Sequence, residues 1–377
     1  MDIFYRKNVT KVIDRYKEWF KEDGKEKYII NIVPKEWKSY NYDLWIDPKT
    51  PKLLSQYDFT NRDELYGYVD AMTLQIQKYW EIKLDWNIDD DMVPTHTVKL
   101  GYAEQAAAIS GENPKYSNVG QTSYLEPFLK EYESIYLDKI MFLPKNKWAA
   151  IIEDSLVYLS KKAENKFFVE SRLDASNPSD LAFEFRGKDL FTDFYDNPEG
   201  VKNLLDICCR ESIKFVEYFR SITKQVDDGY PLTWHGGSWT SGDIYAHDGD
   251  NVADQVSGKI FKDFLVPFHN KMSEHFGGCV FGREARSEHL WKEISKISMI
   301  KAWAPRSLEG IYEVTEEVLD RIIDVIGDLP LILESDTYEK FLWHINVVKK
   351  RNIKAFFIAH CRDLNEAKEI LKEVRSL

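Results

Sequence analysis

The sequence predicts an α/β fold in which eight parallel strands close into a (β/α)8 barrel. Short apolar segments alternate with amphipathic helical stretches along most of the 377 residues, and no Gly/Ser-rich linker interrupts them. This alternation is typical of a parallel sheet, and eight repeats point to a closed barrel. An open doubly wound sheet is the alternative, although no glycine-rich phosphate loop follows the first strand. We expect a single domain over 1–377, with a helical extension at 1–26 and extra helices and loops on the rim at 99–166.

The predicted strands are short, mainly apolar runs separated by helical or turn-forming segments. The first, "KYIINIVP", and the last, "AFFIAH", are the most uniformly apolar. In chain order the strands are 27–34, 85–98, 167–174, 231–237, 279–284, 299–305, 330–335 and 355–360.

Helical stretches are expected between these strands. Residues 62–81 repeat apolar side chains at a spacing of three and four, which is the period of a helix with one buried face. Residues 197–222 begin with Asn197 as a plausible N-cap, followed by proline at the first helical position. Further helices are predicted at 257–276, 335–351 and 364–377.

The net charge and the cysteine content limit which partners and which cellular setting are expected. The net charge of -12 argues against a nucleic-acid partner, which requires a basic face. The four cysteines do not form a disulfide framework, so a reducing cytoplasm is the simplest setting. No segment is apolar enough for a membrane span, and the N-terminus lacks the apolar core of a signal peptide. We expect a cytoplasmic protein with a small-molecule substrate, no nucleic-acid or membrane partner, and a homodimer as the candidate assembly.

Polar residues collect where the predicted strands end, and barrels of this kind concentrate their chemistry at those carboxyl ends. The stretch "PLTWHGGSWTSGD" (231–243) is the most unusual, because a histidine, a glycine pair and a serine follow an apolar strand. We expect its His235 and Ser238 to share one pocket with Asp91 and His360. The other strand-end candidates are Lys35, Lys38, Asp90, Arg172, Trp239, Arg283, Glu284, Glu334, Asp336 and Cys361.

Each candidate also has a structural interpretation. Lysines such as Lys35 are mostly surface residues, and the aspartate run at 89–91 could form a turn or a cap. His235 could be a core histidine. Since neighbouring side chains alternate across a strand, only one of His360 and Cys361 can face the barrel axis, and the loop that follows favours His360.

Three segments resemble the uroporphyrinogen decarboxylase superfamily, and the resemblance extends in order over 27–377. They are "DDDMVPTHTVKLGYAEQAAAISGE" (89–112), "SDLAFEFRGKDLFTDFYDNPEGVKNLLD" (179–206) and "VADQVSGKIFKDFLVPFHNKM" (252–272). The resemblance implies a uroporphyrinogen decarboxylase-like TIM barrel. The superfamily also contains zinc-dependent cobamide methyltransferases, so the fold does not choose between the two activities.

The resemblance implies roles for several residues. Asp91, or Asp90 beside it, matches the aspartate that holds the pyrrole nitrogens, and "GSW" at Ser238 and Trp239 matches a serine–tryptophan pair. His360 in "AHC" resembles the histidine after the last strand of the decarboxylases. Two features depart from the pattern: "VPKEWKSY" replaces an arginine-rich substrate motif, and "AFEF" lacks the expected tyrosine near residue 184. These departures put uroporphyrinogen itself in doubt as the substrate.

The leading functional prediction is therefore a lyase that decarboxylates a carboxylated, tetrapyrrole-like substrate without a cofactor. Asp91 would stabilise a cationic intermediate, and His235 or His360 would move protons. Carboxylates of the substrate would bind Lys35, Lys38, Arg172 and Arg283.

Three alternatives remain. The first is a zinc-dependent methyltransferase with a corrinoid protein as partner and His235, Glu284 and Cys361 as ligands. However, "CVFGREA" lacks the family's histidine–x–cysteine, so no metal is expected. The second is a non-catalytic binding barrel, and the third is a glycosidase that uses Glu284 and Glu334.

Overall fold

A parallel sheet forms the centre of the molecule, which is represented by a computed structural model. The structure describes residues 1–35, 54–117, 122–170, 177–233, 237–242, 244–247, 250–307 and 312–377. Six parallel strands form one sheet in the order β1-β12-β11-β10-β9-β8. They are β1 (Tyr28–Pro34), β8 (Tyr245–His247), β9 (Cys279–Glu284), β10 (Ile300–Arg306), β11 (Leu331–Ser335) and β12 (Ala355–Cys361). The predicted α/β class is confirmed.

The first and last strands of the chain are neighbours in this sheet. They pair in parallel along their whole length, from Tyr28 opposite Ala355 to Pro34 opposite Cys361. β12 also pairs with β11 on its other side. The two ends of the chain are thereby joined through the sheet.

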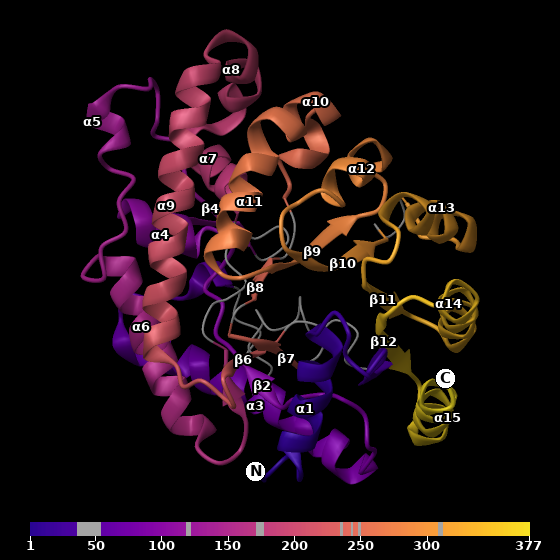
Figure 1. Ribbon diagram of the computed structural model, residues 1–377. Helices are drawn as coiled ribbons and strands as arrows, with labels where there is room; N and C mark the ends of the chain where they lie inside the picture. Colours follow the sequence, from indigo (N-terminus) through magenta and orange to yellow (C-terminus); the bar gives the residue numbers. More distant parts are fainter. Residues whose placement is uncertain are drawn as a thin grey trace.

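Helices cover the sheet, and in Figure 1 α13, α14 and α15 follow one another along β10, β11 and β12. The helices are α1 (Val9–Phe20), α3 (Arg62–Trp86), α4 (Glu104–Ser110), α5 (Ser134–Leu137), α6 (Lys147–Ala163), α7 (Pro178–Arg186), α8 (Leu190–Asp196), α9 (Pro198–Ile222), α10 (Gly258–Ile260), α11 (Val266–His275), α12 (Trp291–Ile294), α13 (Glu316–Ile326), α14 (Tyr338–Arg351) and α15 (Leu364–Arg375). A π-helical turn, Phe261–Leu265, joins α10 to α11. Short 3₁₀ turns occupy Leu54–Gln56, Gly187–Asp189, Ala253–Gln255 and Glu288–Leu290.

The two faces of the sheet are covered differently. Phe356 of β12 contacts Tyr16 and Trp19 of α1 through its ring, whereas the adjacent Phe357 contacts Phe341 of α14. Because side chains alternate along a strand, α1 and α14 cover opposite faces of β12. No helix in the described ranges has both the length and the apolar character needed to cross a membrane.

Three smaller strand pairs accompany the main sheet. β2 (Thr95–His96) pairs in parallel with β5 (Phe168–Val169), while β3 (Lys115–Ser117) pairs with β4 (Thr122–Tyr124) and β6 (Gly229–Leu232) with β7 (Ser238–Ser241) in antiparallel fashion. On the edge of β1 away from β12, the Asp91 backbone amide donates to the Ile30 carbonyl at 2.7 Å. The Val93 amide in turn donates to the Gly237 carbonyl at 3.0 Å.

Two predicted strands differ from the observed elements. The expected strand 85–98 begins as the last turn of α3, which ends at Asn87 in the left-handed region, and the strand is reduced to Thr95–His96. The expected strand 231–237 is half of a hairpin, in which Pro231 lies opposite Trp239. Both differences arise because continuation of a helix and reversal of a strand depend on contacts outside the segment itself.

Candidate functional site

A histidine and a glutamate meet at the carboxyl ends of β12 and β11. Glu334 lies opposite Ile358 in the parallel register, and alternation places His360 on the same face as Ile358. The Nε2 atom of His360 is 2.8 Å from Oε1 of Glu334. This is the face that α1 covers further down the strands, so the pair lies on the inner side of the sheet.

A pocket of about 200 Å³ opens beside His360. It is lined by Lys35, Asp336, Thr337, Tyr338, Glu339, His360, Arg362 and Glu366. Residues 337–339 are the N-cap and first turn of α14. The lining combines the cations Lys35 and Arg362 with the carboxylates of Asp336, Glu339 and Glu366. Arg362 is paired with Glu366 at 3.1 Å, which leaves Lys35 and the positive end of the α14 dipole as the groups that favour an anion.

Asp336 extends the His360–Glu334 pair to a group of three. One oxygen of each carboxylate and one ring nitrogen of His360 all lie within 4.8 Å of one another. Asp336 is partly buried and Glu334 is exposed, whereas His360 retains only 6% of its accessible surface. A buried imidazole is thus brought next to two carboxylates, and His360 and Asp336 of this group line the pocket.

The other ring nitrogen of His360 has no protein partner. Its Nδ1 atom is buried and makes no hydrogen bond in the structure. An unsatisfied buried polar atom costs about 1–3 kcal/mol. Other buried side chains share this property, both ring nitrogens of His96 among them, so the orphaned Nδ1 does not by itself single out His360.

A further cation lies on the neighbouring strand. Trp303 of β10 is opposite Leu331 of β11, so continuing the register places Arg306 level with Glu334, on the same face of the sheet. Arg306 is partly buried. Arg306 itself does not line the pocket.

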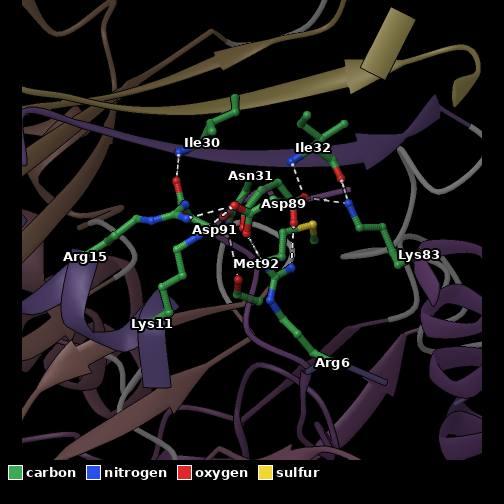
Figure 2. A network of polar contacts seen from close by, with 12 residues as sticks. Arg6, Lys11, Arg15, Ile30, Asn31, Ile32, Lys83, Asp89, Asp91 and Met92 are labelled. Carbon is green, nitrogen blue, oxygen red and sulfur yellow. Dashed lines mark hydrogen bonds and ion pairs between the residues drawn. The ribbon is translucent and has the colours of Figure 1, made fainter. Parts of the chain in front are cut away.

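The aspartates expected in the pocket belong instead to an ion-pair network, shown in Figure 2. Asp90 contacts Lys83 at 2.5 Å and Arg6 at 2.8 Å, and accepts a hydrogen bond from the Ile32 amide. Burial alone would raise the pKa of the Asp90 carboxyl, but the charges of Lys83 and Arg6 hold this pKa below its usual value. A carboxylate paired in this way is a structural anion.

Asp91 is engaged similarly, further down the sheet. Its carboxylate pairs with Arg15 and, at 2.8 Å, with Arg375 of α15, and it accepts a hydrogen bond from the Ile30 amide. His360 is level with Val33, three residues along β1 from Ile30, or about 10 Å along the strand. The structure therefore does not bring Asp91 together with His360.

Ser238 and Trp239 belong to the β6–β7 hairpin. Ser238 is buried opposite Leu232. Trp239 is only 1% exposed, and its Nε1 donates to the Val226 carbonyl at 2.8 Å. The tryptophan therefore packs in the core and does not offer a flat face to a ligand in the pocket around His360.

Several predicted site residues cannot be placed. Lys38, Arg172 and His235 lie outside the described residues, and only the backbone of Arg283 and Glu284 is described. Cys361 is buried, with its Sγ 3.6 Å from the Val33 carbonyl oxygen. Burial raises the pKa of its thiol to about 12. Burial thus disfavours the thiolate form of Cys361 as long as no metal ion is bound.

One buried carboxylate was missed by the sequence analysis. Glu170 follows β5 and is 1% exposed, and its Oε2 accepts hydrogen bonds from the amide and hydroxyl of Thr233. The available signal was a glutamate directly after the apolar run "KFFV". A glutamate that directly follows an apolar strand predicts a buried carboxylate, which must accept hydrogen bonds from nearby donors.

The comparisons with known proteins add no relationship. No protein-family model matches the chain, and a search of curated proteins returns no match. The functional assignment therefore depends on the residues of the pocket and on the motifs described above.

Proposed function

We propose that this chain is a lyase of the uroporphyrinogen decarboxylase type, which removes a carboxyl group from a carboxylated substrate. The observation that carries the proposal is the His360–Glu334 pair at the carboxyl ends of parallel strands, because its histidine lines a pocket that also contains Lys35 and Arg362. Active sites of barrel enzymes lie at this end of the sheet. The sequence prediction named Asp91, His235 and His360 as catalytic; the proposal keeps His360, adds Glu334 and leaves out Asp91.

The chemistry requires an acceptor for an electron pair. When the bond between carbon and the leaving carboxylate breaks, carbon dioxide departs and the two electrons remain on the substrate carbon. A proton from His360 forms the new C–H bond, and Glu334 at 2.8 Å stabilises the protonated imidazole that delivers it. Ion pairs with Lys35 and Arg362 hold a second carboxylate of the substrate in the pocket.

A closed barrel forms part of the proposal. The hydrogen bonds from Asp91 to Ile30 and from Val93 to Gly237 continue the pairing beyond the edge of β1. The pair β2–β5 supplies two further parallel strands. These contacts support a barrel in which β1 has neighbours on both sides.

The methyltransferase alternative receives less support. Its zinc site would need the histidine–x–cysteine that "CVFGREA" lacks, so Cys361 would have no cysteine partner from that strand. The His360–Glu334 pair needs no thiolate to move a proton, so we favour the lyase.

The proposal is tested by carbon dioxide release from a panel of aromatic, 2-oxo and tetrapyrrole carboxylic acids, including uroporphyrinogen. His360→Gln and Glu334→Gln should lower kcat by about 100-fold or more, the range typical of a lost proton-transfer group. In deuterated water the product should carry one deuterium at the carbon that lost the carboxylate.

A surface pair provides the matched control. His275 and Glu217 form a similar contact, 2.9 Å between Nε2 and Oε1, with both side chains exposed. His275→Gln and Glu217→Gln should leave the rate unchanged. The proposal fails if no acid in the panel releases carbon dioxide, or if the pocket variants retain the rate of the surface variants.

A further inference from the structure

We infer that a second pocket, at the opposite end of the strands from His360, binds a free amino acid with an apolar side chain. The pocket has a volume of about 370 Å³, and small-molecule sites usually measure about 300–1,000 Å³. Its charged lining residues are Lys17, Lys21, Lys301 and Asp228. The inference goes beyond the proposed function, because this pocket shares no lining residue with the pocket around His360.

The second pocket lies where the strands of the sheet begin. Lys301 is the second residue of β10, and Trp303, two residues later, is level with Leu331 and Ala355 in the parallel register. His360 lies five residues beyond Ala355, which places it about 23 Å from Lys301 along the strand direction. The last turn of α1 forms another wall of the pocket, and α1 packs against β7 there (Figure 1). An amino acid bound in this pocket therefore does not reach His360.

Two of the four charged lining residues already have partners. Lys17 pairs with Asp227 at 3.0 Å, and Lys21 pairs with Glu18. The Lys17 ammonium also lies 5.8 Å from the centre of the Trp239 ring, which is a cation–π contact. The charges of these two lysines are therefore compensated within the chain, and they do not by themselves call for an anionic ligand.

Lys301 and Asp228 are the charged lining residues that remain. Within the described part of the chain neither side chain forms a hydrogen bond or an ion pair, and the two do not pair with each other although both line the pocket. Lys301 is partly buried, and its stem lies against Gly278, where a Cβ atom would come 2.8 Å from the lysine Cε. The glycine thus leaves the space that this lysine occupies. A ligand with one carboxylate and one ammonium would pair both charges.

The rest of the lining suits an apolar group. Phe20 is partly buried, Ile244 is 3% exposed, and both line the pocket together with Trp239. Small-molecule sites commonly combine apolar walls with a few polar groups that fix the orientation of the ligand. The carboxylate of an amino acid would pair with Lys301 and its ammonium with Asp228, while its side chain packs on the apolar wall. A simple anion or a simple amine would leave one of the two charges unpaired.

The inference is tested by calorimetric titration of the whole chain with three probes of similar shape. They are L-phenylalanine, 3-phenylpropanoate, which lacks the ammonium, and phenethylamine, which lacks the carboxylate. We expect one site per chain for phenylalanine with a Kd below about 1 mM. Each of the other two probes should bind about fivefold more weakly or worse, because one charged contact is lost.

The substitutions should match the probes. Lys301→Met should weaken the binding of phenylalanine and 3-phenylpropanoate about fivefold or more but not that of phenethylamine, whereas Asp228→Asn should weaken phenylalanine and phenethylamine only. Position 228 has a φ of 62°, which asparagine tolerates, so this variant is expected to fold. Lys202→Met, on the exposed surface of α9, and His360→Gln should leave the Kd for phenylalanine unchanged.

Circular dichroism verifies that each variant is folded before titration. Absence of saturable phenylalanine binding to the wild-type chain overturns the inference. Equal affinity for phenylalanine and 3-phenylpropanoate also overturns it, because the pocket would then hold a simple anion. Binding that His360→Gln weakens and Lys301→Met does not would place the ligand in the other pocket, with the same consequence. No turnover is measured, so this result does not depend on the proposed lyase activity.

Discussion

Three consecutive aspartates have different environments, although they are identical in sequence. The side chain of Asp89 is 58% exposed, whereas those of Asp90 and Asp91 are fully buried. Burial of a carboxylate costs several kcal/mol unless cations and donors surround it. Arg6, Lys83 and the Ile32 amide meet this requirement for Asp90, so Asp90 and not Asp89 should matter for stability.

We expect Asp90→Asn to reduce the free energy of unfolding by about 3–5 kcal/mol, because it leaves the buried Lys83 without its anion. Asp89→Asn, at an exposed ion pair, should cost less than about 1 kcal/mol. Urea unfolding measures both. Equal effects of the two substitutions would contradict the structural role of Asp90.

The loss of stability caused by Asp90→Asn should depend on pH. The folded-state pKa of Asp90 lies below its usual value, so its stabilisation is fully present above the unfolded pKa of about 3.9. It is lost as the pH falls through the lower folded pKa. The stability difference between the wild-type chain and Asp90→Asn should therefore be constant near neutral pH and shrink below about pH 4.

At the scale of the element, local signals were read correctly from sequence. Asn197 was expected to cap a helix, and its Oδ1 accepts the Gly200 amide at 3.1 Å at the start of α9. Asn197→Ala should cost about 1 kcal/mol in urea unfolding, while Asn197→Asp should retain most of the stability. Lys202→Ala, on the exposed surface of the same helix, should change it by less than about 0.5 kcal/mol. A loss for Asn197→Ala as small as that for Lys202→Ala would rule out the cap as a stabilising contact.

Contacts between residues far apart in the sequence could not be predicted, and they decide which strand and site predictions failed. β9 occupies the predicted 279–284, and β12 matches 355–360 with one residue added. For β12 the reason is its almost uniformly apolar run, which specifies a buried strand. The strand expected at 231–237 overlaps β6 only at Pro231 and Leu232, because β6 ends there and pairs with the following strand β7 in a hairpin. In the site, His360 could be selected by strand alternation, but Asp91 could not be placed, because its partner Arg375 is 284 residues away.

At the scale of the whole molecule, the sheet joins segments from opposite ends of the chain. β1 pairs with β12 along seven residue pairs, and Tyr16 and Trp19 of α1 pack on Phe356 of β12. The ion pair from Asp91 to Arg375 adds a third contact between these distant segments. None of the three can form within either half of the chain alone.

This arrangement predicts that the chain unfolds as one unit. The backbone turns sharply at Asp227 and Asp228, which both have positive φ and precede β6, so a break there severs little local structure. Fragments 1–227 and 228–377 should nevertheless lack cooperative thermal transitions when separate, because β12 loses β1 and the apolar face of α1 loses its cover. For the intact chain, urea unfolding followed by tryptophan fluorescence and by far-UV circular dichroism should give coincident curves. If either fragment melts cooperatively by itself, the pairing of β1 with β12 is an interface between two domains and not the closure of one core.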